Sequence, residues 1–100
     1  MDILRADDGK PVLKLAGRLD FTHRERFVEM VEAISDELTE ADLRVDCSQL
    51  DDIDSSGLGL LLILRDRLGR SGRGVMLINC GQRVRDVLGM VQFGRLFTLA

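Results

Sequence analysis

Segments with helical periodicity alternate with short apolar runs of strand length along most of this chain of 100 residues. One helical stripe has apolar residues at spacings of four, three and four, at Phe27, Val31, Ile34 and Leu38. The run Val75–Ile78 is apolar throughout and is bounded by glycine and asparagine, which indicates a strand buried on both faces of a sheet. Because parallel strands are joined by crossover helices, this alternation predicts a mostly parallel sheet covered by helices.

The expected order of elements is β-β-α-β-α-β-α-β, an α/β fold with a mixed sheet that begins with a β-hairpin. Asp7–Gly9 is a turn signal between the first two strands, and Gly17–Asp20 is interpreted as a bend out of the sheet. Thr22 with Glu25 fits a capping box at the start of the first helix. We expect strands at 2–6, 11–16, 43–47, 75–78 and 96–99. Three helices are expected: the first follows Thr22, the second spans about 56–69, and the third spans 82–88.

The composition indicates a single globular domain over residues 1–100. Apolar residues make up 45% of the chain, and the net charge of -3 argues against nucleic acid as a general partner. The longest apolar run, Leu60–Leu64, is far too short to span a membrane, and no secretory signal follows Met1. We therefore expect a cytoplasmic protein that contacts no membrane and needs no cofactor or metal. Cys47 and Cys80 are expected to be reduced, buried thiols rather than zinc ligands.

The run Asp54-Ser55-Ser56-Gly57-Leu58-Gly59 stands where the second helix is expected to begin, after a loop at Ser48–Asp54. A helix N-terminus presents unpaired N–H groups and a partial positive charge, so a hydroxyl there can cap the helix or carry a phosphate. Ser55 is expected to be the cap rather than a second phosphoacceptor. Ser56 is then left on a glycine-flanked turn that another protein can reach.

The carboxyl ends of parallel strands meet at one edge of a sheet, and functional loops gather there. The expected loops at that edge are Gly17–Thr22, Ser48–Ser56 and Asn79–Gly81. Asp20 and Ser56 are therefore expected to lie close together although they are far apart in the sequence. For Asp20 and Asp54 two interpretations stay open. Each is either a cap or loop-ordering acceptor, or a residue that orients Ser56 or contacts a kinase.

The second helix carries more apolar residues than one buried stripe needs. At about 100° per residue, its core stripe contains Gly57, Leu60, Leu61, Leu64 and Leu68. Leu58 and Leu62 fall off that stripe, one turn apart. Either a neighbouring loop or helix covers them, or they form an exposed apolar ridge beside Ser56 on which a partner protein docks.

Three parts of the chain resemble the STAS-domain family, and specifically the bacterial anti-sigma factor antagonists. Leu15–Asp20 is similar to the second-strand motif of that family, which ends in Leu-Asp. Asp46–Leu50, leading into Ile53–Gly59, is similar to the segment that bears the regulatory serine. The last part resembles the closing pattern of the family at Leu88, Gly89, Phe93, Leu96, Phe97 and Leu99. The resemblance covers nearly the whole chain and implies a STAS-like domain.

The resemblance implies a phosphorylation-controlled partner switch. In this family the serine directly before Gly-Leu-Gly, here Ser56, is phosphorylated by a partner serine kinase of the histidine-kinase-like ATPase type, and a PP2C-type serine phosphatase reverses the reaction. The unphosphorylated form binds an anti-sigma factor or an equivalent regulator, and phosphorylation breaks that complex. The expected partner-binding residues are Asp20, Phe21, Thr22, Asp54, Ser55, Ser56, Gly57, Leu58, Gly59 and Leu62.

Catalysis by the chain itself is not expected. A serine hydrolase needs a base beside its serine, and the one histidine, His23, is expected on a helix surface rather than on a strand-end loop. The chain also lacks a Gly-x-Ser-x-Gly elbow and a phosphate-binding glycine loop. Two alternatives stay open: the same switch with a biofilm, secretion or second-messenger output, and a constitutive STAS subunit of a lipid-transport complex.

Overall fold

The computed structural model describes residues 1–37, 42–90 and 97–100. In these residues the helices and strands follow one another in the order expected from the sequence. The strands are β1 (Asp2–Arg5), β2 (Pro11–Leu19), β3 (Leu43–Ile53), β4 (Val75–Ile78) and β5 (Thr98–Leu99). The helices are the 3₁₀ turn η1 (Phe21–His23), α1 (Arg24–Glu37), α2 (Ser55–Gly69) and α3 (Gln82–Met90). The predicted α/β class is confirmed.

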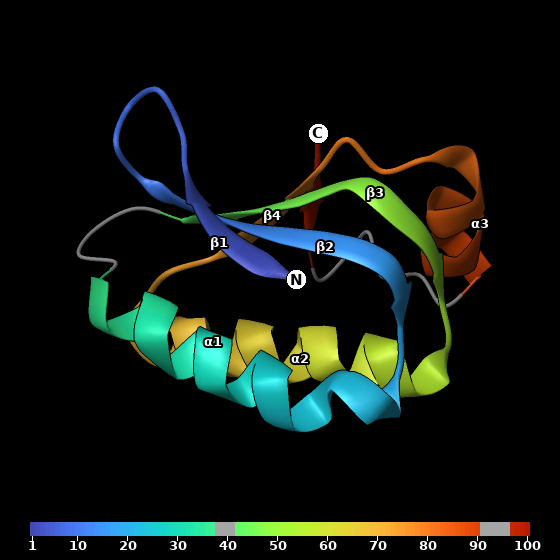
Figure 1. The fold of residues 1–100 in the computed structure, drawn as a ribbon, viewed down its shortest axis with the longest axis horizontal. Coiled ribbons are helices and arrows are strands. Elements are labelled where there is room, and N and C mark those ends of the chain that lie inside the picture. Colours follow the sequence, from blue (N-terminus) through green and yellow to red (C-terminus); the bar gives the residue numbers. More distant parts are fainter. Residues whose placement is uncertain (38–41, 91–96) are drawn as a thin grey trace.

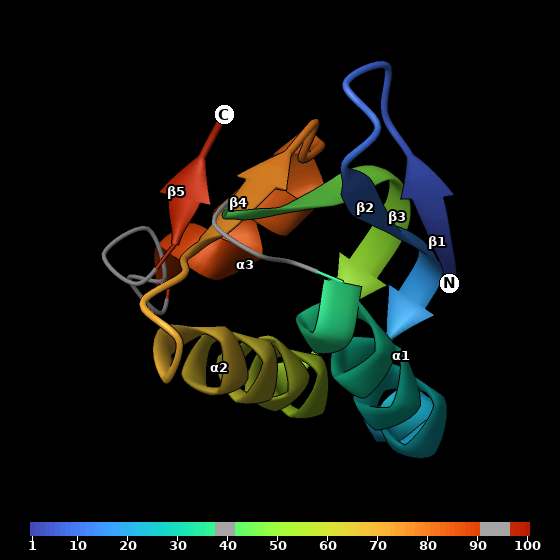
Figure 2. The same cartoon turned by 90° about the vertical axis from the view of Figure 1, so that its left-hand side faces the viewer.

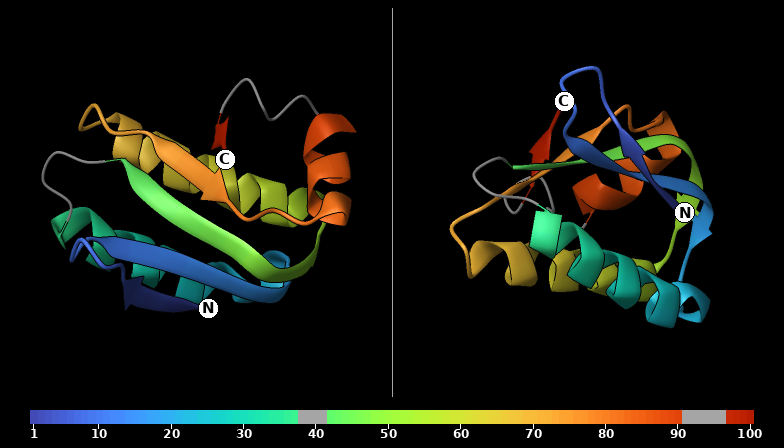
Figure 3. Two further views of the ribbon diagram at one scale, coloured as in Figure 1. Left: turned by 90° about the horizontal axis from the view of Figure 1, so that it is seen from above. Right: turned by 60° about the vertical axis from the view of Figure 1, so that its left-hand side comes forward.

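The strands form one mixed sheet with the spatial order β1-β2-β3-β4-β5. β1 and β2 make an antiparallel hairpin, and the later pairs are parallel, as connections through helices require. α1 and α2 lie side by side against one face of this sheet (Figure 1, Figure 2), and α3 lies at the end toward which β3 runs (Figure 3). The apolar core includes the space between these two helices and the sheet and also contains Val84 and Leu88 of α3.

β2 and β3 are longer than the sequence indicates, which corrects two expectations. Gly17–Asp20 is not a bend out of the sheet, because β2 continues to Leu19. Ser48–Asp54 is not a loop, because β3 continues to Ile53 and stays paired with β2 to that point. The pairing contains two register shifts, the second directly after Gly17, whose φ of 72° favours glycine. Such irregularities bend the two strands without ending their pairing.

Aspartates rather than hydroxyl residues cap the helical turns at this end of the sheet. The Asp20 side chain accepts a hydrogen bond from the N–H of Thr22 at 3.0 Å, at the start of η1. The Asp54 side chain accepts from the N–H of Gly57 at 2.9 Å, at the start of α2. The expected N-caps, Thr22 and Ser55, are therefore wrong, since both lie within a helical turn. In each case the turn begins earlier than the pattern indicates, so the preceding aspartate has the extended backbone that a cap needs.

The predicted apolar stripes are confirmed where the structure describes them. On α2 the whole stripe is buried, namely Gly57, Leu60, Leu61, Leu64 and Leu68. On α1 the buried members are Phe27, Val31 and Ile34. Leu38 lies outside the described residues. Cys47 and Cys80 are buried and free, as expected.

The C-terminal elements differ in detail from those expected. In β4 buried and half-buried residues alternate, so this strand is not buried on both faces. The reason is that α1 and α2 cover one face of the sheet (Figure 2). α3 continues past Gly89, because a helix tolerates glycine at a cost of about 1 kcal/mol. Phe93 and Leu96 of the expected closing pattern lie outside the described residues, and β5 is described from Thr98 onward.

Candidate functional site

The ends of β2 and β3 bring the two predicted site segments together. The carbonyl of Leu19, at the end of β2, accepts a hydrogen bond from the N–H of Asp54 at 3.4 Å. The chain then enters η1 after one strand and α2 after the other. The N–H of Phe21 donates to the Oγ of Ser56 at 2.8 Å. The expected proximity of Asp20 and Ser56 is therefore confirmed.

The hydroxyl of Ser56 is oriented by two polar groups. It donates to Oδ1 of Asp54 at 2.6 Å and accepts from the N–H of Phe21 at 2.8 Å. Because a serine oxygen has two lone pairs, one of them is left for a further contact. The residue is half-buried rather than enclosed. The protein thus holds this oxygen in a defined orientation at its surface.

Gly57 allows α2 to begin close to β2. A Cβ at this position would collide with the carbonyl oxygen of Leu19 and would lie 2.8 Å from Cγ1 of Ile53. A Cβ at Gly59, in contrast, would meet nothing within 4 Å. The first glycine is therefore required by the packing of the helix start, and the second is not. This close approach presses Ser56 against η1.

Two ionised carboxylates flank the Ser56 hydroxyl. The hydrogen bond from Ser56, followed by that from the N–H of Gly57, holds the pKa of Asp54 below its usual value. The hydroxyl of Thr22 has the corresponding effect on the pKa of Asp20. A phosphate on Ser56 would be favoured by the N-terminus of α2 and opposed by these two anions.

Arg18 is a site residue that sequence reasoning did not identify. Its Nη2 lies 3.4 Å from Oδ2 of Asp54, and its Nε lies 3.7 Å from Oδ2 of Asp20. It also stands opposite Asp52 in the register of β2 and β3. Arg83 of α3 contacts Asp52 as well, with its Nε 3.2 Å from Oδ1. The pairing of β2 with β3 is the signal that could have identified Arg18, because it places Arg18 opposite Asp52. The expected strands ended at residues 16 and 47, so they did not include this pair.

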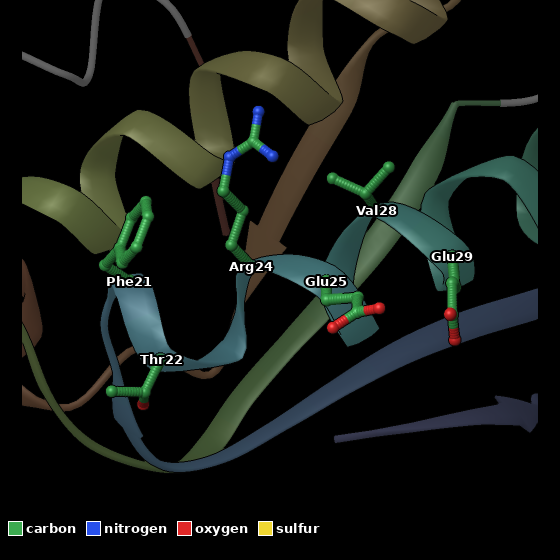
Figure 4. Close-up of a pocket in the computed structure, with 6 residues that line it drawn as sticks. All are labelled: Phe21, Thr22, Arg24, Glu25, Val28 and Glu29. Carbon is green, nitrogen blue, oxygen red and sulfur yellow. The ribbon is translucent and has the colours of Figure 1, made fainter.

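An exposed phenylalanine stands beside Ser56. Phe21 is 67% exposed, and its backbone N–H is the group that donates to the Ser56 hydroxyl. Its ring borders an open cavity of about 720 Å³ on η1 and α1, whose other lining residues are Thr22, Arg24, Glu25, Val28 and Glu29 (Figure 4). Phe21 and Val28 supply the apolar part of this lining. The cavity therefore lies along η1 and the first turns of α1, and it includes Phe21, the residue whose backbone N–H contacts Ser56.

The two leucines outside the core stripe of α2 have different environments. Leu58 is 7% exposed and belongs to the core, whereas Leu62 is 38% exposed. The interpretation of both as one exposed ridge is therefore wrong for Leu58. The reason is that η1 and α1 both contact α2, so the buried surface of this helix is wider than its core stripe. Leu62 remains an apolar residue at the surface.

His23 lies beside an aspartate and not beside the serine proton. Its Nδ1 is 3.4 Å from Oδ1 of Asp20, whereas the Ser56 hydroxyl donates to Asp54. A nucleophilic serine paired with histidine would have its proton directed to the imidazole. Within the described part of the chain, no cluster of three or more His, Cys, Asp or Glu side chains could hold a metal ion. In the same residues, no helix has the length and apolar character needed to cross a membrane.

The fold around this site is shared with solved structures. A candidate anti-sigma factor antagonist of Thermotoga maritima superposes with a TM-score of 0.82 at 19% identity, covering 98% of this chain and 83% of that one. The anti-sigma factor antagonist SpoIIAA in its unphosphorylated form gives a TM-score of 0.71 at 24% identity, covering 99% of this chain and 86% of its own. At these identities the likeness establishes the fold.

Sequence comparison gives the family. A STAS-domain containing protein of Pseudomonas aeruginosa is 33% identical over 95 residues, which cover 95% of this chain and 92% of that protein. The family model described as the STAS domain matches residues 3–100. With the fold, the family model and this relative in agreement, the chain belongs to the STAS-domain family.

Proposed function

We propose that this chain is a phosphorylation-controlled partner-switching regulator. Its unphosphorylated form binds an anti-sigma factor that is also a serine kinase of the histidine-kinase-like ATPase type, or an equivalent regulator. Phosphorylation of Ser56 releases that partner, and a PP2C-type serine phosphatase restores the binding form. The observation that carries the proposal is the half-buried Ser56 hydroxyl, oriented by two hydrogen bonds beside the exposed Phe21.

The charge of a phosphate accounts for much of the free energy needed to switch such a complex, and the domain need not refold. Phosphorylation adds about -1.5 to -2 charge at neutral pH. Asp20 and Asp54 already lie beside Ser56, so the new charge would make this surface strongly negative. A partner that covers Ser56 would then bury an unpaired charge, which costs several kcal/mol. Moving a complex from 99:1 to 1:99 takes about 5.5 kcal/mol, and one phosphate in a tight interface supplies much of it.

The proposed docking surface surrounds Ser56 at the edge where β2 and β3 end. Its contact residues are Asp20, Phe21, Thr22, Asp54, Ser55, Ser56, Gly59 and Leu62. Gly57 and Leu58 are buried and would act from beneath, by holding the start of α2 in place. The chain would work by binding alone, as a cytoplasmic protein without a nucleic-acid or membrane partner.

The site assignment is tested with the purified chain, an ATPase-type serine kinase that it binds, and ATP. Intact mass spectrometry is expected to show one added phosphate on the wild type and on Ser55→Ala, and none on Ser56→Ala. Ser55→Ala is the matched control, because it removes an exposed hydroxyl from the adjacent residue. Phosphate on Ser56→Ala, or its loss from Ser55→Ala, contradicts the assignment.

The partner is tested by affinity capture with Ser56→Ala and Ser56→Asp as baits. An ATPase-type serine kinase is expected to be retained by the alanine bait and released by the aspartate bait. A regulator of biofilm, secretion or second-messenger level with the same preference would support the switch and identify a different output. An ABC transporter retained equally by both baits would indicate a constitutive subunit and would contradict the proposal.

A further inference from the structure

Arg18 and Ser56 are linked through a single carboxylate. The Ser56 hydroxyl donates to Oδ1 of Asp54 at 2.6 Å, and Nη2 of Arg18 lies 3.4 Å from Oδ2 of the same side chain. Nε of Arg18 lies 3.7 Å from Oδ2 of Asp20. The guanidinium group of Arg18 and the Ser56 oxygen, which is the proposed phosphorylation site, therefore contact the same carboxylate.

Phosphorylation removes the hydrogen bond between Ser56 and Asp54. In the transfer, the bond from the γ-phosphorus of ATP to the oxygen of ADP breaks, and a bond forms from that phosphorus to Oγ of Ser56. The hydroxyl proton leaves to the base of the kinase or to water. Oγ then has no proton to donate, so Oδ1 of Asp54 keeps the N–H of Gly57 but loses the serine. Two anions are left next to each other.

We propose that Arg18 becomes the counter-ion of phosphorylated Ser56, moving from its contact with Asp54 to the phosphate oxygens. The inference rests on the proposed function, because it concerns the phosphorylated form. A phosphate carries more charge than a carboxylate, and its oxygens match the planar donor pattern of a guanidinium. Both ion pairs of Arg18 are long, and its side chain is 57% exposed. The new pairing therefore breaks no short hydrogen bond.

Several other charged groups at this end of the sheet either repel a phosphate or have partners of their own. Three carboxylates with lowered pKa values lie here, those of Asp20, Asp52 and Asp54. Arg83 of α3 is held by Asp52, with its Nε 3.2 Å from Oδ1. His23 of η1 faces Asp20 at 3.4 Å. Arg18 is thus the cation on Asp54, the carboxylate that contacts Oγ directly.

The test is a ³¹P NMR titration of the full chain with phosphoserine incorporated at position 56 during translation, so that no kinase is needed. A cation beside the phosphate favours the dianion and lowers its second pKa. For a unit charge about 5 Å away in a water-like medium, Arg18→Gln is expected to raise this pKa by about 0.5. Arg18→Lys is expected to keep most of the lowering, because it retains the charge. Arg83→Gln is the matched control and is expected to have a smaller effect, since Arg83 contacts Asp52 instead.

An unchanged phosphoserine pKa in Arg18→Gln, or an equal rise in Arg83→Gln, would overturn the proposal. Arg18 is exposed, so the glutamine variant is expected to keep the wild-type circular dichroism spectrum, and the lysine variant provides a second comparison with a smaller change of shape. The outcome of the ³¹P NMR titration can be distinguished from the outcome of the kinase assay that tests the proposed function. If no kinase phosphorylates Ser56, the titration still decides the role of Arg18. If the titration shows no effect, phosphorylation of Ser56 is unaffected as a proposal.

Discussion

Replacing Gly57 with alanine is expected to destabilise the domain, whereas the same change at Gly59 is expected to stabilise it. At position 57 the added methyl group would collide with the carbonyl oxygen of Leu19 and would lie 2.8 Å from Cγ1 of Ile53. Both obstacles stand at the ends of paired strands, so they move aside only by disturbing the sheet. Overpacking costs about 1–3 kcal/mol, and a collision with backbone belongs at the upper end of that range. Alanine recovers about 1 kcal/mol of helix propensity, which leaves a net loss of about 2 kcal/mol.

At position 59 the methyl group meets nothing within 4 Å, so the gain of about 1 kcal/mol in helix propensity is kept. In a domain of this size, 1 kcal/mol shifts Tm by about 4–8 °C. Gly57→Ala is therefore expected to melt about 10 °C below the wild type, and Gly59→Ala about 5 °C above it. Thermal unfolding followed by circular dichroism measures both. A Gly57→Ala variant that melts at or above the wild-type Tm would refute the reasoning.

The displacement of α2 also has a functional consequence. In Gly57→Ala the helix start must move away from β2, which lengthens the 2.8 Å hydrogen bond from the N–H of Phe21 to the Ser56 hydroxyl. Phosphorylation of Ser56 by the partner kinase, measured below the melting temperature of Gly57→Ala, is expected to be slower in this variant than in the wild type.

Three further predictions concern pH, thiol reactivity and docking. The pKa of Asp54 is lowered in the folded state, so its contribution to stability is present above the usual value of 3.8 and is lost as the pH falls through the folded value. The urea concentration at the unfolding midpoint is therefore expected to differ less between pH 7 and pH 3 in Asp54→Asn than in the wild type. The same difference in both proteins would argue against a stabilising role of the Asp54 carboxylate. A hydrogen bond from Cys47, helped by the charge of Arg85, lowers the pKa of Cys80, while the same pairing, followed by burial, raises the pKa of Cys47. Iodoacetamide is expected to label Cys80 first at pH 7, and peptide mapping that finds Cys47 labelled first would contradict this. Leu62→Asp is expected to fold normally and to weaken partner binding, because Leu62 lies at the surface. Leu58→Asp places a charge in the core and is expected to unfold the domain. Melting curves test the folding of both variants, and pull-down of the captured partner tests binding by Leu62→Asp.

Local patterns were sufficient for the order of the elements and for much of the core. Helical periodicity and apolar runs are set by residues that are close together in the sequence, so the buried stripe of α2 and the bounds of β4 could be predicted from it. The meeting of Asp20 and Ser56 followed from topology, because parallel strands present their carboxyl ends at one edge. The resemblance to STAS domains also rested on contiguous segments, and the family comparison confirmed it.

The details of the site depended on contacts between distant residues. The lengths of β2 and β3 are set by their pairing, including the register shift after Gly17, and neither strand carries that information alone. The sequence therefore left both Ser55 and Asp54 as candidates for the helix cap, and it did not include Arg18 in the site. The burial of Leu58 likewise follows from η1 and α1 lying against α2. Periodicity reports which face of an element is apolar; how far two strands stay paired, and which neighbours cover a helix, are decided when the whole chain packs.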